Sequence, residues 1–238
     1  MSEIGVLFDD IHTYTEWRLR LKKVEIGQPA AKTVLVDIEG GDGVLDLSTS
    51  LTGDMTYGTR KLKLIFDAAA CDYYRWPDLV SEISDVLHGR RMKIILDIDP
   101  GYYYDGLVEV SNDKINAVFA EITVTAECQP YKMERFSSLD DWLWDPFDFE
   151  TGIIREYKEL RVDESMSFTI EGRRKQIIPV FTVLSDDGSG LKVEFNGSEY
   201  DLPDGTSRVL NIIIKDGVNT LNFTGKGTVS IDYRGGRL

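Results

Sequence analysis

Few side chains in this sequence have the spacing that a reaction centre would need. The chain of 238 residues has two histidines, His12 and His88, and neither lies in a motif with a nucleophile, as a hydrolytic triad would require. We interpret His88 as a residue at the end of a helix, where the helix dipole favours it, and His12 as an exposed residue beside a turn. The sequence therefore predicts no catalytic residues and no enzyme.

Two groups of acidic residues have a spacing that is compatible with a metal site or a glycosidase pair. Asp97 and Asp99 would project from the same side of a strand, but Pro100 and Gly101 follow at once, which favours a solvated strand end. The segment 186–190 (DDGSG) lacks the ligand spacing and the closing glutamate of an EF-hand loop, so a hairpin turn accounts for it. We therefore expect no metal site.

The glycine-rich segment 40–43 (GGDG) and the cysteines give no cofactor site either. The segment lacks the lysine and the hydroxyl residue of a phosphate loop, and Asp42 would repel a phosphate group. Cys71 and Cys128 are too few for a disulfide framework or a cysteine-built zinc site. Cys128 falls on the apolar face of a predicted strand, where an unreactive thiol is usual.

The charge of the chain limits its partners. The formal net charge is −14, which disfavours nonspecific binding to nucleic acid or to an anionic membrane. The longest apolar runs, such as residues 212–214, are far too short to cross a bilayer, and the first ten residues lack the basic start and apolar core of a secretory signal. We expect a soluble protein that is synthesised in the cytosol and has no membrane partner.

Alternating apolar and polar residues predict a mainly β fold. In the first half, the expected strands cover residues 17–26, 62–66, 92–98, 102–110 and 118–128. The first of them has a basic face that includes Arg18 and Arg20, and its alternation slips at Lys23, which indicates a bulge. One helix is expected from Pro77 to His88, packed on one sheet face.

The stretch from Val34 to Phe66 is predicted to be a β framework interrupted by a projecting loop. Val34, Val36 and Ile38 alternate with more polar neighbours, as expected of a strand with one buried face. A glycine-rich turn then leads to a short extended piece over 44–47 and a polar loop, so that residues 40–54 project.

The second half of the sequence predicts a connector followed by a β sandwich. Residues 137–150 hold five acidic residues, no basic residue and the aromatic run Trp142, Trp144, Phe147 and Phe149, which favours a connector whose rings dock on a neighbouring surface. From Met166 onward, short strands alternate with Asp-Gly and Asn-Gly turns. These strands are expected over residues 177–184, 191–195, 209–214, 220–223 and 228–233. The predicted domains are 1–136, the connector 137–152, and 153–238.

Four stretches together resemble one protein family. They are the strand, Gly-Asp-Gly turn, LDL segment and following TG pair within 36–66, the C-x-P-Y motif at 128–131, WLWDPFDFETGII at 142–154, and GVNTLNFTGKGTVSIDYRGGRL at 217–238. In these stretches, and so over nearly the whole chain, the sequence resembles the distal tail protein (Dit) family of long-tailed, siphovirus-type bacteriophages and prophages.

The resemblance implies a structural protein of the virion tail tip, made in the cytoplasm of the bacterial host. In that family the N-terminal β domain forms a hexameric ring, and the C-terminal domain is a galectin-like β sandwich on the outside. The ring hub connects the tail tube to the tail-associated fibre or lysin protein and to receptor-binding proteins, and DNA passes without specific binding. A closed ring needs two different surfaces on each copy, and unpaired sheet edges and the projecting loop 40–54 are suitable.

Three further hypotheses follow from these readings. The acidic composition suggests a ring lumen that is neutral or negative, so that passing DNA is not retained. A carbohydrate-binding module for host cell-wall recognition is the alternative function, with sugar stacking on Trp142 and Trp144 or on the weaker candidates Tyr157, Tyr200 and Tyr233. A hydrolase is the third possibility, and it has no catalytic constellation to support it.

Overall fold

The computed structural model describes residues 4–50, 52–68, 73–114, 120–141 and 153–238. The chain forms two compact units, the first from Met1–Asp99 and Tyr103–Lys132 and the second from Pro100–Tyr102 and Met133–Leu238. The fold is mainly β, as predicted. The aromatic run of the predicted connector, Cys71 and Val118 lie outside the described residues.

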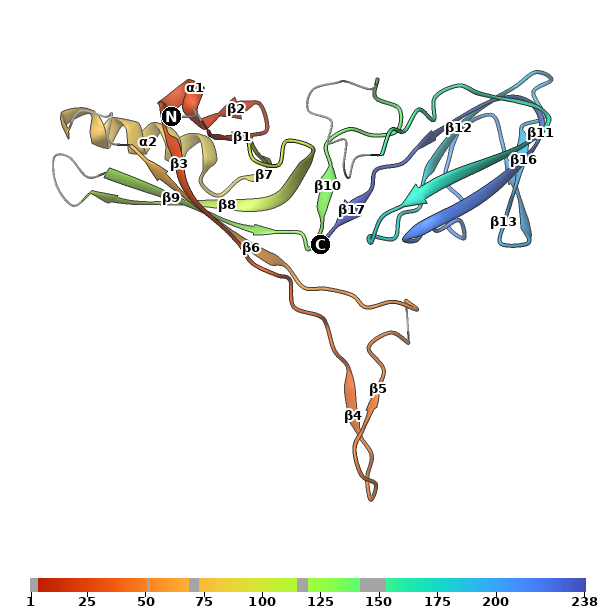
Figure 1. The fold of residues 1–238 in the computed structure, drawn as a ribbon, viewed down its shortest axis with the longest axis horizontal. Helices are drawn as coiled ribbons and strands as arrows, with labels where there is room; N and C mark the ends of the chain where they lie inside the picture. Colours follow the sequence, from red (N-terminus) through yellow and green to blue (C-terminus); the bar gives the residue numbers. More distant parts are fainter. Residues whose placement is uncertain (1–3, 51, 69–72, 115–119, 142–152) are drawn as a thin grey trace. The chain divides into compact units, whose positions relative to one another are not determined.

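Unit 1 is built on one antiparallel sheet with a helix on one face (Figure 1). Within the described residues its strands run in the order β2 (Ile11–His12), β1 (Val6–Phe8), β7 (Arg91–Leu96), β8 (Tyr102–Lys114), β9 (Ala120–Cys128), β6 (Arg60–Asp67) and β3 (Arg20–Ile26). The predicted alternation is confirmed in β6, where Leu62, Leu64 and Phe66 have no exposed surface. These side chains form one core with residues from the helix and the neighbouring strands.

Helix α2 (Trp76–Leu87) is the helix that the sequence predicts, shifted by one residue at each end. A 3₁₀ turn (Tyr73–Arg75) leads into it, and Pro77 lies in its first turn, where a missing backbone N–H is tolerated. Ile83 and Leu87 lie one turn apart and are fully buried in the core of unit 1.

The early strand begins later than predicted, because a short helix occupies its first residues. Helix α1 (Thr13–Trp17) ends at Arg18, whose left-handed backbone (φ 56°) closes the helix. Strand β3 therefore starts at Arg20, and Trp17 is a helical core residue. The predicted bulge is confirmed, since the register of β3 against β6 shifts between Leu21 and Lys23.

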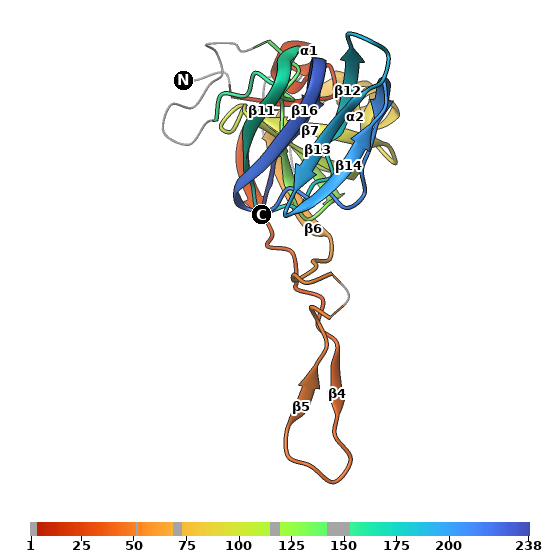
Figure 2. The ribbon, with the colours of Figure 1, turned by 90° about the vertical axis from the view of Figure 1, so that its right-hand side faces the viewer.

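Unit 2 contains one six-stranded antiparallel sheet, seen face-on in Figure 2. Its strands are β11 (Leu160–Gly172), β12 (Val180–Ser185), β13 (Leu191–Phe195), β14 (Ser198–Leu202), β15 (Gly205–Ser207) and β16 (Gly217–Asp232). Two strands predicted separately over 220–223 and 228–233 are one continuous strand, β16. The strand predicted over 209–214 is absent from the described structure, where Ile214 makes only an isolated bridge to Ile177.

Strand β16 lets this sheet bend around its own core. One edge of β16 pairs with β11 at residues 217–229, whereas the other edge pairs with β13 at residues 222–224 and with β12 at residues 227–232. Gly225, between the two segments, has φ 125°, a conformation that other residues rarely adopt. The bend places the apolar side chains of both halves in a single buried cluster.

Candidate assembly interface

A two-stranded extension leaves the sheet of unit 1 between β3 and β6. Residues 27–32 run antiparallel to 56–61, held by backbone hydrogen bonds from Gly27 to Lys61 (2.8 Å), from Lys32 to Thr56 (2.9 Å) and from Gly58 to Ala30 (2.8 Å). Beyond them lies a hairpin of β4 (Leu35–Asp37) and β5 (Val44–Asp46), which pairs with no other strand of the described residues (Figures 1 and 2). We call residues 27–59 the arm.

The two faces of this hairpin differ in chemistry. Residues directly opposite each other in an antiparallel pair share a face, and here Val36 lies opposite Leu45 and Asp37 opposite Val44. One face, which we call the aliphatic face, therefore carries Val34, Val36, Ile38, Leu45 and Leu47. The other, which we call the acidic face, carries Leu35, Asp37, Val44 and Asp46. Charged side chains are confined to the second face of the paired segment.

The aliphatic face is exposed, which contradicts the prediction of a strand with one buried face. Val34, Val36, Ile38 and Leu45 keep between 44% and 53% of their surface in contact with solvent. The alternation was read correctly, but no described element packs on the hairpin. An isolated two-stranded hairpin is at best marginally stable in water, and a contiguous apolar surface of this kind marks an interaction site.

Strand β3 supplies a second open surface on the same unit. It is the terminal strand of the described sheet, so one of its edges has no strand beside it. Its exposed side chains include Arg20, Lys22 and Lys23. Lys22 forms an ion pair with Glu121 on β9, and Lys23 forms one with Glu25.

His12 has partners, which corrects its interpretation as simply an exposed residue. Its Nε2 lies 3.0 Å from Asp97 Oδ2, and its Nδ1 lies 3.2 Å from the Thr15 hydroxyl. The Asp97 carboxylate also accepts a hydrogen bond from the backbone N–H of Gly5 at 2.7 Å. These contacts tie β2 and the start of unit 1 to the end of β7, and we assign them a structural role.

Asp97 and Asp99 do not act as a pair, because each has its own cationic or polar partner. Asp99 binds the Lys132 ammonium at 2.5 Å, whereas Asp97 faces His12. Strand β7 ends at Leu96, two residues before the predicted end at residue 98, so both carboxylates lie beyond the strand. Among the residues that the structure describes, no three His, Cys, Asp or Glu side chains are grouped to hold a metal ion.

The remaining polar candidates have local structural roles. His88 is the C-cap of α2, and its Nδ1 accepts a hydrogen bond from the Val110 backbone N–H at 3.0 Å. In the turn 186–190, Asp187 accepts hydrogen bonds from the hydroxyl (2.6 Å) and the backbone N–H (2.9 Å) of Ser189, which lower the pKa of this carboxyl. The hydrogen bonds from Arg161 likewise lower the pKa of Asp186.

Cys128 is a core thiol, as its position on β9 predicts. It is fully buried, and burial raises the pKa of Cys128 to about 12. Gly106 lies opposite it on β8, and a Cβ atom at Gly106 would lie 2.5 Å from the Cys128 sulfur. The thiol therefore fills the space that this glycine leaves, and it has little thiolate character for chemistry.

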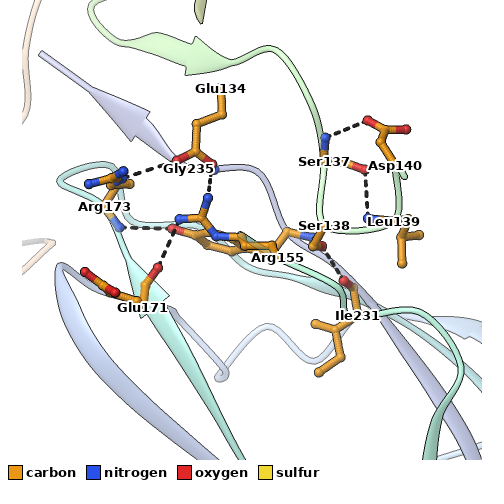
Figure 3. Close-up of polar contacts among 11 residues, drawn as sticks. Glu134, Ser137, Ser138, Leu139, Asp140, Arg155, Glu171, Arg173, Ile231 and Gly235 are labelled. Carbon is orange, nitrogen blue, oxygen red and sulfur yellow. Dashed lines mark hydrogen bonds and ion pairs between the residues drawn. The ribbon is translucent and has the colours of Figure 1, made fainter. Parts of the chain in front are cut away.

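Unit 2 contains a buried ionic cluster that the sequence did not indicate (Figure 3). The Glu134 carboxylate accepts hydrogen bonds from Arg155 (2.5 Å), from Arg173 (3.2 Å) and from the Gly235 backbone N–H (2.9 Å). The Arg155 guanidinium also lies over the ring of Tyr233, 5.0 Å from its centroid. The cluster joins four segments of the chain around the C-terminal strand.

Ser138 adds a second fastening beside this cluster. Its hydroxyl donates to the Ile231 carbonyl (2.5 Å) and accepts from the Tyr233 backbone N–H (2.7 Å). Ser138 and Arg155 therefore both contact the chain at or directly after the end of β16. We interpret the cluster as an anchor for the entering chain and not as a binding site.

Two of the three candidate sugar-stacking tyrosines of unit 2 are buried. Tyr157 and Tyr233 are buried, and burial raises the pKa of both phenols, while Tyr200 is half-buried. The outward face of β11 and β16 instead carries short polar side chains such as Ser165, Ser167, Thr220 and Thr224. These observations do not favour a stacking site for sugars on this sheet.

The chain shares its fold with a phage protein of known structure. No protein-family model matches the chain, and no curated protein matches it. Among solved structures, it is similar to the SPP1 Dit (gp 19.1) protein, whose crystal structure is described as a paradigm of the hub adsorption apparatus in phages that infect Gram-positive bacteria. The TM-score is 0.60 at 12% sequence identity, over 97% of this chain and 98% of that one. The chain has the fold of a phage Dit protein.

The Dit fold agrees with the family that the four sequence stretches resemble, although the two chains share few identical residues. Sequence reasoning missed part of this candidate interface, because it assigned Val34, Val36 and Ile38 of the aliphatic face to a buried face, whereas it placed Leu45 and Leu47 in the projecting segment. A signal was available, because the hairpin strands are short and flanked by glycine-rich and polar segments with no further apolar run to cover them. Among the helices of the described residues, none has the length and apolar content to span a membrane.

Proposed function

We propose that this chain is a distal tail protein, a structural component of the tail tip or baseplate of a siphovirus-type phage or prophage. The observation that carries the proposal is the match to the SPP1 Dit fold over 97% of the chain, which includes both units. The exposed arm supports it, since a protein that works by assembly needs surfaces that its own fold leaves open. No enzymatic role is proposed.

In this role the N-terminal domain, residues 1–136, forms a hexameric ring, the segment 137–152 is the connector, and residues 153–238 form a galectin-like sandwich on the outside. The ring connects the tail tube protein to the tail-associated fibre or lysin protein and to receptor-binding proteins. Heterologous contacts that close into a ring require two different surfaces on each copy. The arm and the open edge of β3 are two such surfaces.

The proposed location is the virion tail tip, after synthesis in the host cytoplasm. Passing DNA would meet a lumen that is neutral or negative, in keeping with the net charge of −14. A ring reconstruction with a lumen lined mainly by arginine and lysine would overturn this part of the proposal.

The mass of the full chain in solution tests the proposal. Light scattering at several concentrations, alone and with the tail tube and fibre proteins, is expected to show a species of six copies, which negative-stain microscopy would image as a ring. A chain in which residues 32–56 are replaced by a short glycine turn serves as the control and is expected to remain monomeric. A full chain that stays monomeric in every mixture would overturn the proposal.

A further inference from the structure

We infer that the arm of one copy pairs beside strand β3 of a second copy and so extends the sheet of unit 1 across the boundary between the two. The inference rests on the proposed function, because it names the partner surface that would close the ring. It is supported by the complementarity of the arm and the outer edge of β3, in their backbone groups, apolar side chains and charges.

The backbone of β3 has free hydrogen-bonding groups along its outer edge. The N–H of Gly27 points toward β6, where it donates to the Lys61 carbonyl, so the alternate residues Val24 and Ile26 direct their backbone groups away from β6. Nearer the start of the strand, the Leu21 N–H donates to the Ile4 carbonyl at 3.0 Å. The open segment of the edge therefore covers residues 24–26, at the end nearest the arm.

The core-facing side of β3 is incompletely covered. Leu21 and Val24 are only partly buried against the core of unit 1, and Ile26 keeps 40% of its surface in solvent. Added beside this edge, the aliphatic face of an arm would cover these side chains. The same contact would remove the exposed valines and leucines of the aliphatic face from water.

The opposite side of β3 is basic and the arm is acidic. Arg20, Lys22 and Lys23 lie on this strand with a single acid, Glu25, whereas the arm has one base, Lys32. The acids of the arm are Asp37, Glu39, Asp42, Asp46 and Asp54. Arg20 has no ion-pair partner in the described part of the chain, which leaves it available to an incoming carboxylate.

The two matches require the same face of the arm to point toward the core. Side chains alternate between the faces of a sheet, so the register that places the aliphatic face beside Val24 and Ile26 also places Asp37 and Asp46 on the basic side. A slip by one residue would place these carboxylates against the core. Such a slip would bury unpaired charges and is disfavoured.

The receiving edge must belong to another copy. The arm continues the β3–β6 pair in line, through the hydrogen bonds of Gly27 with Lys61 and of Lys32 with Thr56, so it leads away from the edge of its own β3. Each copy then offers an arm and accepts one, which is the heterologous pattern that closes into rings.

Charge exchange tests the pairing. The full chain with Asp37→Lys and Asp46→Lys, and separately with Lys22→Glu and Lys23→Glu, is expected to assemble about tenfold more weakly in light scattering, because like charges would face each other. The four substitutions in one chain are expected to restore assembly to within about threefold of the original. Lys192→Glu with Lys226→Glu, two exposed lysines of unit 2, is the charge-matched control and should assemble normally.

A second pair of variants separates the faces of the arm. Val36→Asp on the aliphatic face is expected to abolish assembly, whereas Leu35→Asp on the acidic face, at a similarly exposed neighbouring position, should weaken it by less than about threefold. Equal effects of Val36→Asp and Leu35→Asp on assembly would overturn the inference. So would a four-substitution chain that assembles no better than the two double variants while its unfolding midpoint is unchanged. Either result would leave the proposed function standing. An original chain that never assembles would overturn both.

Discussion

Strands β4 and β6 are built from similar residues, but their side chains lie in opposite environments. Leu62, Leu64 and Phe66 of β6 are fully buried between the sheet and helix α2, whereas Val34 and Val36, in and beside β4, are about half exposed. The two strands differ in what lies over them, since β6 has a helix on one face and strands on both edges and β4 has only β5. An apolar face without a cover in its own chain indicates a cover from another chain, and this comparison supports assembly as the function.

The largest expected effect is the loss of stability when a buried ion pair, as opposed to an exposed one, loses a partner. Glu134→Ala would leave Arg155 buried without its carboxylate and is expected to lower the free energy of unfolding by about 3–5 kcal/mol. Asp186→Ala, which removes the exposed partner of Arg161, should leave the denaturant midpoint nearly unchanged. Equal midpoints for the two variants, measured by urea unfolding, would contradict the role of burial.

The second prediction tests the two strands directly. Leu64→Ala removes a fully buried side chain and is expected to lower the free energy of unfolding by about 2–5 kcal/mol. Leu45→Ala in the arm is expected to change it by less than about 0.5 kcal/mol in dilute monomeric protein. A large loss at Leu45 under monomeric conditions would mean that the arm is covered by its own chain.

The third prediction concerns the space around glycines in the same two regions. Gly106→Ala would bring a methyl group within 2.5 Å of the Cys128 sulfur and is expected to cost about 1–3 kcal/mol in unfolding free energy. At the tip of the arm, Gly40 has no heavy atom within 4 Å of a Cβ, so Gly40→Ala should cost only the strain of its positive φ angle, about 1 kcal/mol. Double substitution of Gly106 and Cys128 to alanine should recover part of the first loss.

The last prediction, for which no change is expected near neutral pH, is a pH dependence that originates in the core. The pKa of Cys128 is about 12 in the folded chain, above its ordinary value, so the unfolded chain loses this proton first as the pH rises. The contribution of the thiol is therefore fully present below about pH 9 and decreases between about pH 9 and 12, by up to about 1.4 kcal/mol per pH unit. Unfolding free energies of the original chain and of Cys128→Ala, compared across this range, should differ in slope. Parallel curves would contradict a buried neutral thiol.

Much of the secondary structure could be predicted because it depends on local periodicity. The alternation at 62–66 and 120–128, the helix with Pro77 in its first turn, and the bulge near Lys23 all follow from neighbouring residues. The early strand was predicted to begin too soon because Thr13–Trp17 is too short to show helical periodicity. The continuous β16 was predicted as two strands, whereas Gly225 and Gly227, with φ angles of 125° and 159°, lie within one strand.

The polar contacts could not be predicted, because their partners are far apart in the sequence. His12 meets Asp97 across 85 residues, and Glu134 meets Gly235 across 101. Nothing in the segments around these residues marks them as partners. Only the order of strands in each unit brings them together.

The sequence by itself determined which residues alternate, where the turns fall and that the chain is mainly β, since these properties arise from backbone geometry over a few residues. Only the tertiary structure decided which apolar faces are covered and which charges are paired, because burial depends on segments that are distant in the chain. The arm shows the difference most clearly. Its alternation can be read from Val34 to Ile38, but its exposure is a property of the whole fold.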